Sequence, residues 1–206
     1  KSKLIVMLVF PLAGLLYFSA TGVWEKWGQV QEMQSLEAMS GLAVKVATFV
    51  HESQKERGLT GGFVGSKGAK FTSELPAQRL ETDKRMADLK MALQDVEGTR
   101  YGGALKSAAE DASRKLEMLQ GKRDAISALS ISPDDAIGYY TGMNASLLNV
   151  VSRIVHMSAN GEMSKRLAGY VNFLQGKERV GIERAILNNT FVQDKFGPGM
   201  YGKVSA

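Results

Sequence analysis

Apolar residues recur every three or four positions along most of the chain, the spacing that is typical of helices with one buried face. Five stretches follow this pattern, at residues 26–57, 74–97, 101–129, 133–158 and 162–194. We find no convincing stretch with the two-residue alternation that is typical of a strand. Long helices joined by short breaks predict an all-α protein, built as an up-and-down antiparallel helical bundle.

The breaks between these stretches carry turn and capping residues. The sequence "GLTGGFVGSKG", residues 58–68, contains five glycines and predicts that the first long helix ends at Arg57. It could be taken for a phosphate-binding loop, but no "GK[ST]" follows and no strand precedes it, so we interpret it as a turn. In "SISPDD", Ser132 is predicted to cap a helix whose first residue is Pro133, with two aspartates at the positive end of the helix dipole.

A charge-free segment near the N-terminus predicts a membrane span. Residues 4–23 carry no charge, and a helix of that length crosses about 30 Å of hydrocarbon. Two lysines precede the segment, which favours a cytoplasmic start, and Trp24 and Trp27 follow it where a membrane interface is expected. The predicted division is a cytoplasmic stub (1–3), a transmembrane helix (4–23) and a periplasmic helical-bundle sensing domain (24–206). A buried core helix is the alternative for residues 4–23.

The composition excludes several classes of chemistry. The 206 residues contain no cysteine, which excludes thiolate metal sites and thiol nucleophiles, and the two histidines do not have a metal-binding spacing. We find no catalytic or nucleotide-binding motif, so we expect no enzyme, no cofactor and no metal. The formal net charge of +5 is not gathered into a basic stripe with interleaved aromatic residues, so we expect no nucleic-acid partner.

Two arginines lie in line with apolar positions at helical spacing. The two stripes, each spaced four, three and four residues apart, are Val46, Val50, Ser53, Arg57 and Val180, Arg184, Leu187, Phe191. A guanidinium on a buried face needs an anionic partner, because an unpaired buried charge is costly. A glutamate such as Glu56, Glu178 or Glu183 could supply it in a structural ion pair. Alternatively, the two arginines could meet across the bundle around a small planar oxyanion, such as nitrate or nitrite.

Two segments resemble signatures of a known family. Residues 51–83, "HESQKERGLTGGFVGSKGAKFTSELPAQRLETD", resemble the first motif of the nitrate- and nitrite-sensing (NIT) domain, and residues 174–191, "LQGKERVGIERAILNNTF", resemble its second. The resemblance implies a helical bundle that binds nitrate or nitrite through arginines. The matching positions are Arg57 and Arg184, while Arg179 lies close by and off the stripe, and is ranked lower.

The resemblance and the predicted membrane span together suggest a role. The family occurs in antiterminators, sensor kinases, cyclases and chemoreceptors, and a span leading into the bundle suits a methyl-accepting chemotaxis protein of the bacterial inner membrane. Anion binding would then shift one helix against another and pass the signal across the membrane. We expect a homodimer, contact with the lipid bilayer, and cytoplasmic signalling partners reached through regions outside this chain.

Three alternatives stay open. The bundle could be the input domain of a sensor kinase or cyclase, it could sense another small anion, or it could be a structural interaction module with no small ligand. The family's domains usually continue past the second signature, so we expect the domain to be incomplete at Ala206, with further ligand residues beyond it.

Overall fold

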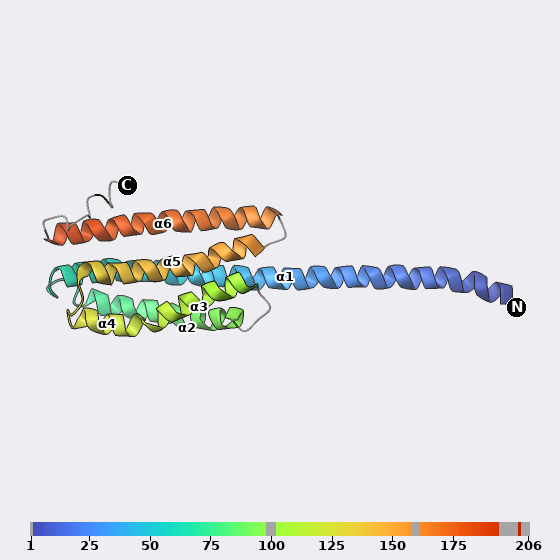
Figure 1. The fold of residues 1–206 in the computed structure, drawn as a ribbon, viewed down its shortest axis with the longest axis horizontal. Helices are drawn as coiled ribbons and strands as arrows, with labels where there is room; N and C mark the ends of the chain where they lie inside the picture. The colour runs from blue at the N-terminus through green and yellow to red at the C-terminus, as the bar shows by residue number, and fades with distance from the viewer. Residues whose placement is uncertain (1, 98–101, 158–160, 194–201, 203–206) are drawn as a thin grey trace. The chain divides into compact units, whose positions relative to one another are not determined.

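The computed structural model describes residues 2–97, 102–157, 161–193 and 202, and within these ranges it contains six α-helices and no strand (Figure 1). The helices are α1 (Ser2–Gly65), α2 (Glu74–Glu97), α3 (Gly103–Glu117), α4 (Leu119–Ser127), α5 (Pro133–Met157) and α6 (Gly161–Gln193). The prediction of an all-α protein is confirmed. The predicted helix ends at 101, 158 and 194 fall outside the described residues.

The chain divides into two compact units, Lys1–Gly41 and Leu42–Ala206, and α1 contributes to both. In the first unit the large apolar side chains described between Leu12 and Met33 are exposed, and Trp24 has 84% of its surface accessible, whereas Met39 is buried. Among the residues that the structure describes, no helix combines the length and the apolar character that crossing a membrane requires. The transmembrane assignment of residues 4–23 therefore stays a prediction.

The second unit is a helical bundle in which α5 contacts both α3 and α6, and α3 also contacts α2 (Figure 1). Its core is apolar, since burying such side chains drives the packing of amphipathic helices. Fully buried members from three helices are Leu89, Leu93, Leu105, Leu116, Met143 and Leu147. The helical bundle predicted from the spacing of apolar residues is confirmed.

The first long helix does not end at Arg57, so the predicted turn at residues 58–65 is wrong. The helix continues to Gly65, because glycine here permits close packing instead of breaking the helix. A Cβ atom at Gly61 would lie 3.1 Å from Ile137 of α5, and one at Gly62 would lie 2.3 Å from the ring of Phe71. Neighbouring side chains occupy the space that larger residues would need.

The helix ends instead in a Schellman motif. The amide of Gly68 donates to the carbonyl of Phe63 at 2.9 Å, and the amide of Lys67 donates to the carbonyl of Val64 at 3.0 Å. Lys67 and Gly68 both have positive φ angles, 54° and 81°. The glycine that favours the left-handed region is therefore the last one of the glycine-rich segment.

The helix predicted over residues 101–129 is two helices, since Met118 interrupts it with a ψ of −10°. Leu116 and Leu119 are buried on either side of this interruption, so the predicted apolar stripe still faces the core. The predicted start of α5 is confirmed. The Ser132 hydroxyl oxygen accepts the amide hydrogen of Asp135 at 3.1 Å, and the hydroxyl donates to the Asp135 carboxylate at 2.7 Å.

Candidate functional site

Arg57 is the largest side chain that is fully buried among the described residues. It lies in α1, and its Nη1 donates to the hydroxyl oxygen of Thr141 on α5 at 3.0 Å. The same nitrogen donates to Oε1 of Glu178 on α6, forming an ion pair in which Glu178 has 8% of its side chain accessible. Because a buried guanidinium without a counter-charge is strongly destabilising, the Glu178 carboxylate offsets a large part of that cost.

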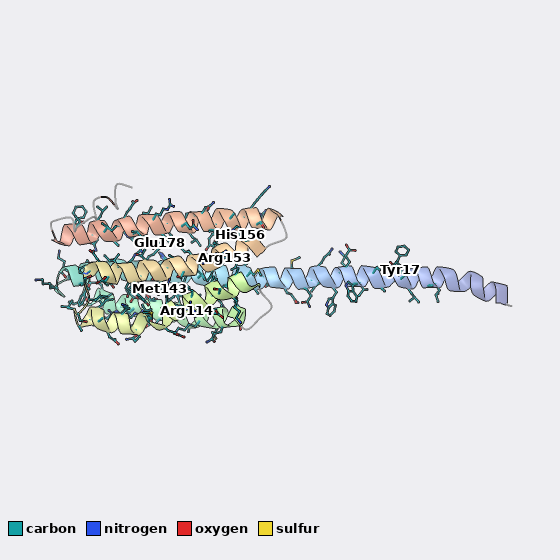
Figure 2. The ribbon with its side chains drawn as sticks, in the orientation of Figure 1. Tyr17, Arg114, Met143, Arg153, His156 and Glu178 are labelled. Carbon is teal, nitrogen blue, oxygen red and sulfur yellow. The ribbon has the colours of Figure 1, made fainter. Side chains whose placement is uncertain are left out.

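The Glu178 carboxylate is also held by amides. Its Oε2 accepts from Nε2 of Gln54 at 2.6 Å and from Nδ2 of Asn144 at 3.5 Å. The Ser53 hydroxyl in turn donates to Oδ1 of Asn144 at 2.8 Å. Figure 2 shows Glu178 on the side of α6 that faces α5. We call this polar layer, which draws on α1, α5 and α6, the Arg57 cluster: Ser53, Gln54, Arg57, Thr141, Asn144 and Glu178.

Two nitrogens of the Arg57 guanidinium, Nε and Nη2, are buried and have no hydrogen-bond partner. Together they form one edge of the planar group, with N–H donors arranged to meet two oxygens of one anion. The backbone of α6 approaches this edge at Gly181, where a Cβ atom would lie only 2.8 Å from Nη2. Glycine at position 181 is therefore what lets the guanidinium fit beneath α6.

A second buried network is centred on Glu56, the residue that precedes Arg57 in α1. The Glu56 carboxylate accepts from Nε and Nη2 of Arg123 on α4, at 2.7 and 2.8 Å, and from the Tyr140 hydroxyl at 2.7 Å. Arg123 also donates to Asp83 at 2.6 Å. Burial, reinforced by the Glu56 charge, raises the pKa of Tyr140. We call these four residues, Glu56, Asp83, Arg123 and Tyr140, the Glu56 cluster.

The other two predicted ligand residues, Arg184 and Arg179, are both exposed on α6. Arg184 lines a surface cavity of about 440 Å³ together with Lys55, Gln78 and Asn188. The hydrogen bonds of Arg57 go to Thr141 and Glu178, so the structure joins Arg57 to a glutamate and places Arg184 on the surface. A glutamate partner was one of the two alternatives that the sequence left open.

The predicted inward stripe of α6 is on the wrong face. Val180 and Phe191, which share that stripe with Arg184, have 63% and 78% of their surface accessible. Buried positions of α6 instead include Val171, Leu174, Glu178, Gly181 and Ala185, spaced three, four, three and four residues apart, and Ile186 beside the last of them. The sequence shows this spacing, but the glutamate and the glycine within it make this face of α6 less apolar than the face that carries Arg184. Tertiary pairing with Arg57 decides between the two faces.

A polar contact beside the Arg57 cluster also joins α1 to α6. Nζ of Lys177 lies 3.0 Å from Nδ1 of His51. Partial burial lowers the pKa of His51, and the positive charge of Lys177 lowers it further. Farther along the same two helices, Nδ2 of Asn188 donates to the carbonyl oxygen of Gly58 at 3.2 Å.

The chain belongs to the nitrate and nitrite sensing family, NIT, whose sequence profile matches residues 48–206. The family expected from the two signatures is thereby confirmed, and the chain is a nitrate- and nitrite-sensing domain. The comparison does not specify which residues bind the anion, so the predicted ligand residues remain predictions.

Two relatives place the chain within the family. It is 26% identical over 179 residues to the nitrate regulatory protein of Klebsiella oxytoca, covering 82% of this chain and 42% of that protein. It also has the fold of the NasR transcription antiterminator, with a TM-score of 0.80, 24% sequence identity, and coverage of 85% of this chain and 48% of that one. The chain thus spans less than half the length of either relative.

Proposed function

We propose that this domain senses nitrate or nitrite by binding the anion at the free edge of the Arg57 guanidinium. The observation that carries the proposal is a fully buried arginine with two unpartnered guanidinium nitrogens in a family of nitrate and nitrite sensors. Both ions are planar, carry one negative charge, and present oxygens that a guanidinium edge can contact in pairs. They are also weakly hydrated, so moving them into a buried site costs less than moving phosphate.

Arg184 and Arg179 are proposed as secondary anion contacts. Both are exposed, and Arg184 lines the surface cavity that includes Gly58, the residue after Arg57. In that position a guanidinium attracts anions toward the site, but solvent screens its charge. Substituting either residue should therefore weaken binding less than substituting Arg57.

Calorimetric titration of the chain with sodium nitrate and sodium nitrite tests the proposal. Replacement Arg57→Gln should abolish the heat of binding, and Arg57→Lys should weaken it, because an ammonium group cannot offer a planar pair of donors. Arg153→Gln is the matched control, since Arg153 is an exposed arginine on α5. Sodium chloride and sodium sulfate control for ionic strength. An absence of heat with the wild-type chain, or an unchanged affinity in Arg57→Gln, rejects the site.

A structural role without any small ligand is the second candidate, and the Arg57–Glu178 ion pair favours it. A ligand that binds only the folded state raises its stability, by about 2.7 kcal/mol at one hundred times the dissociation constant. Thermal unfolding with a panel of small anions separates the candidates. A melting temperature that rises with nitrate or nitrite supports sensing, whereas one that responds to none of the anions supports the structural role.

Placement in a membrane receptor is a further part of the proposal. Its support is the charge-free sequence of residues 4–23 and the exposed aromatic residues Phe18, Trp24 and Trp27. In this arrangement the sensing domain is periplasmic, the protein is a homodimer in the inner membrane, and its output is chemotaxis. The two relatives described above favour a nitrate-responsive transcription regulator instead.

Fractionation of bacterial cells that express the chain distinguishes these two outputs. Retention in carbonate-washed membranes, with the bundle cleaved by protease added to the periplasm, supports the receptor. Recovery of the whole chain in the soluble fraction rejects it and leaves the sensing site unaffected, because the Arg57 cluster lies wholly within the second unit.

A further inference from the structure

The Arg57 cluster contains one positive and one negative group in this structure. Its other four residues are neutral amides and hydroxyls, namely Ser53, Gln54, Thr141 and Asn144. Arg57 and Glu178 therefore already balance one another. A nitrate or nitrite ion added beside them would bring two anions to one guanidinium, and like charges in a buried site repel strongly.

The limited space beside the guanidinium also opposes anion binding in this arrangement of the helices. A Cβ atom at Gly181 would lie 2.8 Å from Nη2 of Arg57 and 3.7 Å from Cδ of Gln54. The backbone of α6 thus lies close to Nη2, one of the two free nitrogens of that edge. An anion of three or four atoms can contact that edge only when α6 lies farther from α1.

Two separate charged networks hold the two sides of α1. On one side, Glu56 binds Arg123 of α4 through two short hydrogen bonds and Tyr140 of α5 through a third. On the other side, the Arg57–Glu178 ion pair joins α1 to α6, together with hydrogen bonds from Gln54 to Glu178 and from Asn188 to the Gly58 carbonyl. Weakening the ion pair would loosen α6, while the Glu56 cluster keeps α1 in place against α4 and α5.

We propose that Glu178 competes with the bound anion for Arg57, so that anion binding breaks the Arg57–Glu178 pair and moves α6 away from α1. This inference rests on the proposed function and adds the conformational change that anion binding triggers. Glu178 acts as an internal anion that holds the unliganded state and sets the affinity for nitrate or nitrite. The moving element is α6 and not α1.

The variant Glu178→Gln tests the competition, because it removes the charge and keeps the size and one acceptor oxygen. Titrated with sodium nitrate, it should bind at least ten times more tightly than the wild-type chain. Glu183→Gln is the matched control, since it makes the same charge change at an exposed position of the same helix and should leave the affinity unchanged.

A distance measurement tests the motion with Glu178 intact, so it does not depend on the folding of the glutamine variant. The chain has no cysteine, and single pairs of spin labels can therefore be placed at exposed positions. Labels at Val44→Cys and Phe173→Cys report on α1 and α6, and labels at Val44→Cys and Met91→Cys report on α1 and α2. Saturating nitrate should change the first distance by about 1–2 Å and leave the second unchanged.

The outcomes separate this inference from the function on which it rests. Tighter binding in Glu178→Gln together with a nitrate-dependent α1–α6 distance supports it. Suppose that the wild-type chain binds nitrate through Arg57. Equal or weaker binding in Glu178→Gln, or an α1–α6 distance that nitrate does not change, then overturns the competition and leaves the anion site in place. Failure of both the wild-type chain and Glu178→Gln to bind nitrate or nitrite overturns the anion site and the inference together.

Discussion

Glu56 and Arg57 are consecutive residues of α1, and each pairs with an opposite charge on a different helix. Glu56 binds Arg123 of α4, and Arg57 binds Glu178 of α6. Successive residues of a helix point about 100° apart, so one turn of α1 reaches both sides of the bundle. The sequence motif Glu-Arg-Gly thus encodes a connection between two halves of the core as well as an arginine suited to an anion.

Breaking the Glu56 cluster should strongly destabilise the fold. In Glu56→Gln the buried Arg123 loses its main counter-charge, and the free energy of unfolding should fall by about 3–5 kcal/mol, measured by urea denaturation. Glu81→Gln is the control, because Glu81 pairs with Lys84 on the surface and its loss should cost about 0–1 kcal/mol. Equal effects of the two substitutions would contradict the buried pair.

The continuation of α1 past Arg57 can be tested at its glycines. Gly58 is helical and a Cβ there meets nothing within 4 Å, so Gly58→Ala should raise the free energy of unfolding by about 0.5–1 kcal/mol. Gly68→Ala should lower it, since Gly68 has a φ of 81°. Thermal or urea unfolding of both variants provides the measurement. Destabilisation by Gly58→Ala would indicate a turn at that position.

The fit of Arg57 beneath α6 depends on Gly181. In Gly181→Ala the new methyl group would lie 2.8 Å from Nη2 of Arg57, so the guanidinium or α6 must shift and the free energy of unfolding should fall. Gly176→Ala, on an open face of the same helix, should instead stabilise the chain by about 1 kcal/mol. Urea unfolding of the two variants gives the comparison. A free energy of unfolding in Gly181→Ala equal to that of the wild-type chain would show that the guanidinium is not confined there.

The contact between His51 and Lys177 predicts a pH effect. Partial burial, Lys177, Lys55 and Arg184 lower the pKa of His51, and Glu52 partly opposes them. A depressed pKa means that the folded state binds the proton less well than the unfolded chain. The contribution to stability is therefore present above pH 6.5 and is lost as the pH falls through the lower pKa of the folded state.

A proton NMR titration of the His51 ring measures this effect. The wild-type value should lie below 6.5, and Lys177→Met should raise it, because the substitution removes the second-largest cause of the shift. Lys165→Met, an exposed lysine on the same helix, should leave it unchanged. A His51 pKa that does not respond to Lys177→Met would contradict the contact across α1 and α6.

Much of the fold was predictable because helix formation and burial act locally. The spacing of Leu89 and Leu93, and the cap at Ser132, were sufficient to place α2 and the start of α5. The glycines at residues 58–65 do not identify their role from the sequence alone, since a glycine can break a helix or permit close packing. Only the neighbours, Ile137 and Phe71, decide which role it takes.

The order of amino acids is enough to predict the helical class, the core-facing stripes of most helices, the family, and Arg57 as a buried charge. The inward face of α6 depends on the packing of the bundle, and with it the pairing of Arg57 with Glu178 and the exposure of Arg184. Two faces of α6 carry apolar residues at similar spacing, so the residues of α6 alone do not determine which face is buried. The buried guanidinium of another helix selects the face that carries a carboxylate and, one turn on, a glycine.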